Sequence, residues 1–307
     1  MHRATLFIIG LSLTLGTASL ALAKDVVNAP NLDVLPVTRS STGAFEMIKP
    51  LIDANAFFEA GQYEQSYKNY SAVFLHDPDN VEVLFGLAQS ALYLDKGNIA
   101  EKAFNRLANY QLTPAQSSVQ FSGLVLAEIV SGTSKNPEGR LKQALKVTPN
   151  NPKLWNALGQ EYDAQMRWAE AWDAYKRASA KGGSKAGFHN NLGMSLLAQK
   201  KYKGAVSHFN YAVKLAPLQK QFENNWRFAL LMNGDYQAAL ENVGEDQAAI
   251  LLGDAGYIAM QREDFTLARA LLEKAIEVSP RYNERAALNL EKLEARHNEF
   301  SNTESDT

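Results

Sequence analysis

The sequence predicts an all-α fold: an α-solenoid, a right-handed superhelix of about six or seven stacked helix pairs. Two observations carry this prediction. Aromatic and small residues recur 34 residues apart through the middle of the chain, and prolines recur near multiples of the same spacing. A fixed period of roughly 20–50 residues is typical of repeat proteins, because one such repeat cannot bury its apolar face alone and must stack on the next.

The clearest repeat begins near Trp155. Its spaced aromatic and small residues are Trp155, Leu158, Gly159, Tyr162, Ala171, Tyr175 and Ala178. The same places 34 residues later hold His189, Leu192, Gly193, Leu196, Ala205, Phe209 and Ala212, and Pro217 closes that repeat. Small residues such as Gly159 and Ala171 let two antiparallel helices approach closely, and a proline ends a helix because it cannot continue it. Each repeat therefore predicts a pair of antiparallel helices.

The remaining repeats are set by their closing prolines. These are Pro78, Pro114, Pro149, Pro217 and Pro280. The last interval is 63 residues instead of the 68 that two full repeats need, so we expect the second helix of the sixth repeat to end early, around 243–246. The repeat at 116–150 diverges most, because Pro137 stands where a small residue is expected, and it could form a degenerate turn.

Over about Met47 to Pro280, this pattern resembles the tetratricopeptide repeat (TPR) family, with the highest specificity at 151–219. The resemblance implies a scaffold that binds protein partners in a groove lined by the first helix of each pair. None of the motifs HExxH, GxSxG, GxxxxGK[ST] or GxGxxG is present. We therefore expect a binding protein and not an enzyme, and an enzyme with catalytic residues on the solenoid face is the less favoured alternative.

The chain divides into four predicted segments. Residues 1–23 read as a secretory signal peptide, with Arg3 before an apolar core and small residues up to Ala23. An uncleaved membrane anchor is the alternative, since the apolar stretch lies at the lower length limit for spanning a bilayer. The other segments are an extended or disordered arm at 24–46, the solenoid with a C-terminal capping helix at 47–300, and a disordered tail at 301–307. Cleavage after Ala23 would deliver the mature chain to the periplasm.

Composition excludes several classes of function. The 307 residues carry a formal net charge of -2, so the chain lacks the basic excess that binding to a nucleic-acid backbone requires. It has no cysteine, which excludes disulfides, thiol chemistry, cysteine-ligated metals and an acylated N-terminal cysteine. We expect no cofactor, no small-molecule substrate and no nucleic-acid partner. Membrane association is expected only through partners or through an uncleaved anchor.

A ladder of asparagines is the strongest candidate for a partner-binding site. The residue after the first aromatic place of three consecutive repeats is Asn156, Asn190 and Asn224, and a second asparagine follows at Asn191 and Asn225. Amide side chains both donate and accept hydrogen bonds, so such a ladder could hold the backbone of an extended peptide. The alternative is that asparagine simply tolerates an exposed helix surface.

Further candidates lie on the same predicted face. Met194, Phe228 and Tyr257 would suit an amphipathic segment of a partner, although they could equally belong to the core. In TPR domains that hold a terminal carboxylate, groove asparagines act together with basic residues. Here only Lys153 and Arg227 are placed for that role, so capture of a free C-terminus is not expected.

One histidine pair could in principle bind a metal. His189 and His208 fall on the two helices of one predicted pair. Because His189 takes the place that Trp155 holds in the preceding repeat, we interpret it as a packed core residue and predict no metal site.

A narrower resemblance is to periplasmic TPR proteins of pilus and secretion machines, above all the TadD-like proteins of tight-adherence (Flp) pilus assembly. It rests on a signal peptide, a proline-containing arm and the number of repeats in a chain of this length. Many of those proteins are lipoproteins, and this chain departs from them by lacking cysteine. The resemblance implies an adaptor that binds a secretin or pilus component. A periplasmic chaperone or a polysaccharide-export scaffold is the alternative.

Overall fold

The computed structural model describes residues 48–278 and 284–305, and the regular structure within them is helical, as predicted. These residues form two compact units, 48–183 and 184–305. The predicted signal peptide and the whole predicted arm at 24–46 lie outside the described residues. None of the helices in the described ranges is long and apolar enough to span a membrane.

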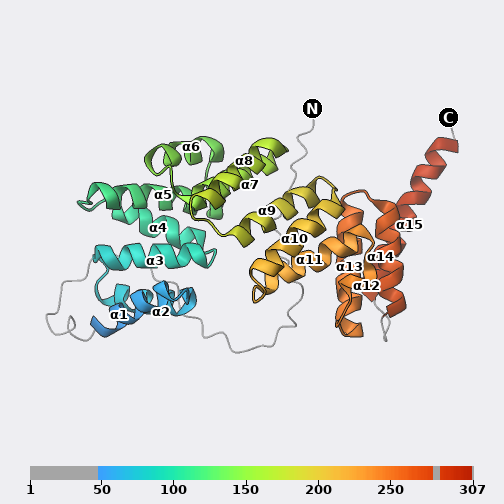
Figure 1. Ribbon diagram of the computed structural model, residues 1–307, viewed down its shortest axis with the longest axis horizontal. Coiled ribbons are helices and arrows are strands. Elements are labelled where there is room, and N and C mark those ends of the chain that lie inside the picture. The colour runs from blue at the N-terminus through green and yellow to red at the C-terminus, as the bar shows by residue number, and fades with distance from the viewer. Residues whose placement is uncertain (1–47, 279–283, 306–307) are drawn as a thin grey trace. The chain divides into compact units, whose positions relative to one another are not determined.

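Antiparallel helix pairs joined by tight turns build both units (Figure 1). The first unit contains α1 (Ile48–Glu59) and α2 (Tyr63–His76), α3 (Val81–Tyr93) and α4 (Gly97–Leu107), α5 (Pro114–Ser131) and α6 (Pro137–Val147), and α7 (Pro152–Ala164) and α8 (Trp168–Ala180). The second unit contains α9 (Lys185–Ala198) and α10 (Tyr202–Leu215), α11 (Lys220–Asn233) and α12 (Tyr236–Ala239), α13 (Glu245–Gln261) and α14 (Phe265–Val278), and a last helix, α15 (Glu284–Ser305). The predicted division into helix pairs is confirmed.

The divergent third pair is a true helix pair and not a degenerate turn. Pro137 is in the first turn of α6, where a proline removes no helical hydrogen bond. The Asn136 side chain caps this helix by accepting a hydrogen bond from the Gly139 backbone N–H at 3.1 Å. At the start of α5, Thr113 and Gln116 form a reciprocal capping box. Local start signals therefore define both helices of the pair.

The backbone repeats with the same period as the sequence. The turn inside each pair contains one residue with a positive φ angle: Gly61 (72°), Asp95 (54°), Gly132 (72°), Met166 (58°), Lys200 (58°), Gly234 (87°) and Glu263 (60°). Most of these follow one another at 34 residues. Gly132 comes 37 residues after Asp95 because α5 is 18 residues long, whereas Glu263 comes 29 residues after Gly234 because α12 has only 4.

The close approach of paired helices depends on glycine, as predicted. A Cβ atom added at Gly159 would lie 2.5 Å from Cε1 of Tyr175, and one added at Gly193 would lie 2.7 Å from Cε1 of Phe209. Both rings are buried on the second helix of their own pair. A side chain at either glycine would therefore have to displace an aromatic ring from the core.

The short α12 confirms the predicted early end of the sixth repeat. Arg227 of α11 replaces part of the missing helix, since its Nη1 donates to the backbone carbonyls of Ala239 at 2.7 Å and Glu241 at 3.0 Å. Carbonyl groups at a helix end lack partners within the helix, and a cation there satisfies them. The shortened pair also brings together the turns on either side of it. Lys200, in the turn between α9 and α10, donates from Nζ to the carbonyl of Arg262, in the turn between α13 and α14, at 2.9 Å.

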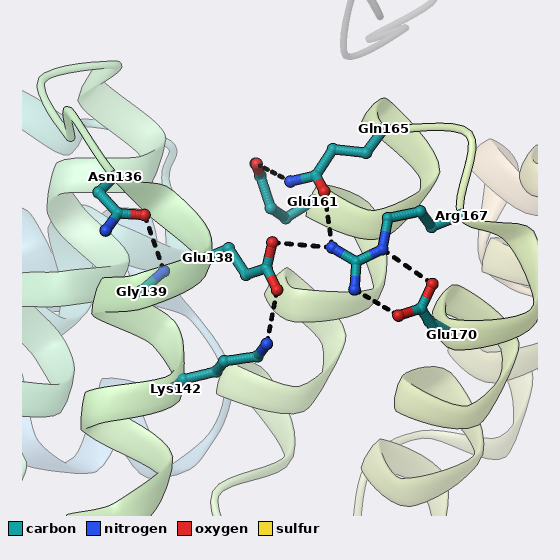
Figure 2. Close-up of polar contacts among 8 residues, drawn as sticks. All are labelled: Asn136, Glu138, Gly139, Lys142, Glu161, Gln165, Arg167 and Glu170. Atoms are coloured by element: carbon teal, nitrogen blue, oxygen red, sulfur yellow. Dashed lines mark hydrogen bonds and ion pairs between the residues drawn. The ribbon is translucent and has the colours of Figure 1, made fainter.

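An ion-pair network ties α6 to the turn between α7 and α8 (Figure 2). Glu138 accepts hydrogen bonds from Lys142 Nζ at 2.6 Å and from Arg167 Nη1 at 2.9 Å. Arg167 also pairs with Glu170 through Nε and Nη2 and donates to Gln165 Oε1 at 2.8 Å. Hydrogen bonds from Lys142 and Arg167 hold the pKa values of Glu138 and Glu170, respectively, below their ordinary range. Charged side chains thereby join the third pair to the fourth.

The last helix covers the end of the second unit. Ala286 and Leu293 of α15 are buried in the apolar core that α9 to α14 form. The sequence places the end of this capping helix near Phe300, and the structure continues it to Ser305. A terminal helix of this kind shields the apolar face that a further repeat would otherwise cover.

Candidate functional site

The residues predicted to bind a partner are divided between the two units and differ in exposure. Lys153 and Asn156 belong to the first unit, and the others belong to the second. The exposed ones are Lys153 and Tyr257, the half-buried ones are Asn156, Asn191, Met194, Asn224 and Arg227, and the buried ones are Asn190, Asn225 and Phe228.

Two asparagines of the second unit bind each other. Asn225 Nδ2 on α11 donates to Asn190 Oδ1 on α9 at 2.8 Å, and Asn190 Nδ2 donates to Asn191 Oδ1 at 3.3 Å. Asn190 is 8% exposed and Asn225 is 4% exposed. A buried amide needs such a partner, because leaving it unsatisfied costs about 1–3 kcal/mol. The pair therefore joins neighbouring repeats, and a peptide held by Asn190 would have to compete with Asn225.

The other predicted residues of the second unit have equally specific surroundings. Phe228 is buried in the core, and Met194 packs against that core. The Arg227 Nε and Nη2 atoms donate to Glu223 Oε1 at 3.1 Å and 3.0 Å. Its Nη1 atom donates to the Ala239 carbonyl at the end of α12. Of the three predicted apolar contact residues, Met194, Phe228 and Tyr257, only Tyr257 is exposed to solvent, at 46%.

In the first unit, Lys153 lies against aromatic residues that the sequence patterns did not predict. Its Nζ is 3.4 Å from the centroid of the Tyr93 ring. Tyr93 stacks on Tyr63, with ring centroids 3.7 Å apart and planes 8° apart, and Phe58 meets both rings edge-on. We call Phe58, Tyr63, Tyr93 and Lys153 the aromatic–lysine cluster. It brings together the ends of α1 and α3 and the starts of α2 and α7.

The ammonium group of this cluster is poorly solvated. Although Lys153 as a whole is exposed, burial of its amine lowers the pKa of Lys153 to about 8, against a smaller opposing effect of Tyr63. No carboxylate in the described part of the chain contributes to this pKa. Partial burial and a hydrogen bond with Tyr93 raise the pKa of Tyr63, so Tyr63 stays neutral near pH 7. An anionic group brought to this amine would be stabilised by it more than by a fully hydrated lysine.

Spacing alone could not reveal this cluster. Tyr63 and Tyr93 are 30 residues apart and so occupy different places in the 34-residue repeat. The repeat pattern identifies Tyr63 as a residue near the start of a second helix and assigns no role to Tyr93. The contact between Tyr93 and Lys153 joins α3 to α7 across an intervening pair, which depends on how the pairs stack.

A family model matches part of this chain, and several solved structures resemble it. The family model of the tetratricopeptide repeat matches residues 156–219. No curated protein was found to match the chain. Among solved structures, the thermophilic TPR protein TTC0263 from Thermus thermophilus is 19% identical, and the match covers 60% of this chain and 99% of that one with a TM-score of 0.49.

Two further structures illustrate the range of similar proteins. YrrB, described as a TPR protein with an unusual peptide-binding site, is 19% identical over 57% of this chain and 92% of its own, with a TM-score of 0.39. The human IFIT1 dimer with m7Gppp-AAAA is 18% identical over 81% of this chain and 63% of its own, with a TM-score of 0.56. At this identity, the likeness to IFIT1 supports the fold alone.

The helix pairs, their common backbone period and the matching family model define the class of this protein. It contains tetratricopeptide repeats at 156–219, and its described residues form the helix pairs of an α-solenoid. Proteins of this class are typically non-enzymatic scaffolds for protein–protein interaction, because stacked helix pairs create extended surfaces for partners.

Proposed function

We propose that this TPR protein is an exported adaptor that holds a segment of a partner protein against the aromatic–lysine cluster of the first unit. The observation that carries the proposal is the Lys153 amine, which lies on the Tyr93 ring with a pKa lowered to about 8 and with no contribution from a carboxylate of the described chain. A partly desolvated cation without an anionic neighbour is a suitable site for an acidic group from outside.

The chemistry around Lys153 indicates the kind of segment. An acidic side chain of the partner would pair with the amine, and an apolar or aromatic neighbour would pack on Tyr93, which is 40% exposed. Asn156 lies three residues further along α7, so it is on the same side of the helix as Lys153. We propose that its amide binds the backbone of the segment, which is the role that the asparagine ladder suggested.

A second contact surface is proposed in the second unit. Its accessible members are Asn191, Met194, Asn224 and Tyr257. Asn190, Asn225, Arg227 and Phe228 support them from within the structure, through the amide pair, the cap of α12 and the core. The proposal therefore keeps the predicted site residues and separates those that would touch a partner from those that would position them.

The proposed location is the periplasm, supported by the signal-like sequence that precedes Lys24. The proposed role is assembly of a pilus or secretion apparatus, most closely of the Tad/Flp type, with a secretin or pilus component as partner. A periplasmic chaperone or a polysaccharide-export scaffold is the second candidate. The m7Gppp-AAAA present in the IFIT1 structure is not transferred to this chain, whose net charge of -2 does not favour nucleic acid.

The test is a crosslinking pull-down from intact cells with the tagged full-length protein, followed by mass spectrometry of the recovered partners. Lys153→Met should lower recovery of the main partner about tenfold, equivalent to ~1.4 kcal/mol of binding free energy. The matched control is Lys176→Met, which removes a lysine whose amine lies 5.0 Å from the Trp172 ring on α8.

The pull-down tests the proposed binding site and the proposed assembly role separately. Equal recovery with Lys153→Met and the wild type would contradict the proposed site. Recovery of secretin or pilus subunits would support the assembly role, whereas polysaccharide-synthesis proteins or a broad set of envelope clients would replace it with the second candidate.

A further inference from the structure

Two histidines of the second unit meet through the same ring nitrogen. His189 on α9 and His208 on α10 place their Nδ1 atoms 3.1 Å apart, with ring centroids 5.3 Å apart. Both residues are half-buried. The rings of Phe188 and Tyr211 pack against His189, at centroid distances of 5.2 Å each. The partner-binding surfaces proposed above make no use of this pair.

We propose that His189 and His208 form a two-imidazole site for a divalent transition metal, represented by Zn²⁺, which their Nδ1 atoms bind and water completes. Imidazole nitrogen is a preferred ligand of zinc, nickel and copper, whereas calcium and magnesium prefer oxygen. The ligand type therefore selects the class of metal.

The separation of the two nitrogens fits coordination to one ion. Zinc–nitrogen bonds of about 2.0–2.1 Å in a tetrahedral site place two ligand nitrogens about 3.3 Å apart. Neighbouring ligands at a right angle, as in square-planar or octahedral sites, lie about 2.9 Å apart at the same bond length. The observed 3.1 Å falls between these values. One Nδ1 carries the proton of this hydrogen bond, so metal binding requires that ring to change tautomer, with its proton on Nε2, and both rings to turn their Nδ1 lone pairs toward the ion.

The fold holds the two ligands in place before any metal binds. His208 directly precedes Phe209, and His189 lies one helical turn before Gly193, so both flank the tight Gly193–Phe209 contact between α9 and α10. Metal binding then costs little additional ordering of side chains. The same packing agrees with the sequence-based interpretation of His189 as a core residue. A packed imidazole can still bind a metal through one of its two nitrogens.

Burial keeps the pair in the neutral form that a metal ligand requires. Partial burial lowers the pKa of His189, and burial together with the nearby His189 lowers that of His208. Neutral imidazoles bind metal without first losing a proton near pH 7.

The described part of the chain supplies two ligands to this site, His189 and His208. Within the described ranges, no cluster of three or more His, Cys, Asp or Glu side chains could hold a metal ion. The remaining coordination positions are open to water or to a ligand from another molecule. We therefore infer an exchangeable site and not a structural zinc on which folding depends.

The test is a Zn²⁺ titration of the full-length protein by calorimetry, with ¹⁵N NMR of the histidine rings. We expect one zinc equivalent that shifts the Nδ1 resonances of His189 and His208. His189→Trp and His208→Gln should each weaken it at least about tenfold, the loss of ~1.4 kcal/mol or more. Trp is chosen because Trp155 holds the corresponding place in the preceding repeat.

The control is His76→Gln, which removes an exposed histidine of the first unit and should leave this equivalent unchanged. Undiminished zinc binding by the double variant His189→Trp/His208→Gln would overturn the proposal. Shifts of the Nε2 resonances alone in the wild-type protein would also overturn it, and that measurement does not depend on whether a variant folds.

Discussion

The third and sixth helix pairs depart from the 34-residue period in opposite directions. In the third pair, α5 is lengthened to 18 residues, and local start signals cap both helices. In the sixth pair, α12 is reduced to 4 residues, and Arg227 reaches from α11 to bind the carbonyls at its end. One departure adds helix, and the other replaces helix with side-chain contacts.

The difference shows what a helical repeat can absorb. A longer helix satisfies its own additional backbone groups, so the insertion needs no new partner elsewhere. A missing helix leaves carbonyl groups and apolar surface that other residues must cover. We therefore expect the stability of regular pairs to be most sensitive to substitutions at the contact between their two helices. The stability of the shortened pair should be most sensitive to substitution of one side chain, that of Arg227.

The largest expected effect is in a regular pair. Gly193→Leu forces a side chain against Phe209, where even a Cβ atom would be 2.7 Å from the ring, and overpacking of this kind costs about 1–3 kcal/mol. Chemical denaturation followed by circular dichroism measures the loss. Gly187→Leu on the same helix is the control, because its Cβ would meet nothing nearer than Ser184 Cβ at 3.4 Å. Equal losses for the two variants would show that helix contact does not set the sensitivity.

The next largest effect should fall on the shortened pair. Arg227→Met removes both hydrogen bonds to the end of α12. The carbonyl of Ala239, whose hydrogen bond is part-buried, then lacks a partner, at a cost near the lower end of about 1–3 kcal/mol, whereas the carbonyl of exposed Glu241 can bind water. Hydrogen exchange should report local opening of 236–245 in addition to lower global stability. Arg285→Met is the matched control, since that arginine is 86% exposed and lies 3.7 Å from Asp254. If both arginine variants behaved alike, Arg227 would not be the replacement for the missing helix.

The smallest effect concerns Lys153 and is a dependence on pH. Its pKa is lowered to about 8 in the folded protein, so between pH 8 and its ordinary value the unfolded chain binds more protons than the native one. This lysine therefore makes stability rise with pH in that window. Lys153→Met should flatten the dependence between about pH 8 and 9.5, measured by urea denaturation at several pH values, and Lys176→Met should not. A wild-type profile identical to that of Lys153→Met would contradict burial of the amine.

The sequence predicted the fold more completely than the sites. The 34-residue spacing identified the pairs and the early end of α12, because glycine, alanine and proline act through local packing and backbone geometry. Because of Pro137, the sequence did not decide whether the third repeat forms a helix pair or a degenerate turn, since a proline can begin a helix as well as break one. These features depend on short stretches of chain.

The sites depend on how pairs stack, and spacing does not specify that. Asn190 and Asn225 belong to the predicted ladder, but their mutual hydrogen bond requires the registry of α9 on α11. The contact of Lys153 with Tyr93 likewise joins residues that are 60 apart in the sequence and occupy non-equivalent places in their repeats. Sequence could nominate Lys153 and Asn156 but could not reveal the aromatic surface beside them.

The most direct test of the account places a photoreactive amino acid at Tyr93 and records crosslinks in living cells. The account predicts a discrete protein partner that crosslinks from Tyr93 and is lost when Lys153→Met is added. The same group at Trp172, which is 45% exposed on α8, serves as the comparison. Crosslinks from Trp172 with none from Tyr93 would contradict the claim that the aromatic–lysine cluster holds the partner.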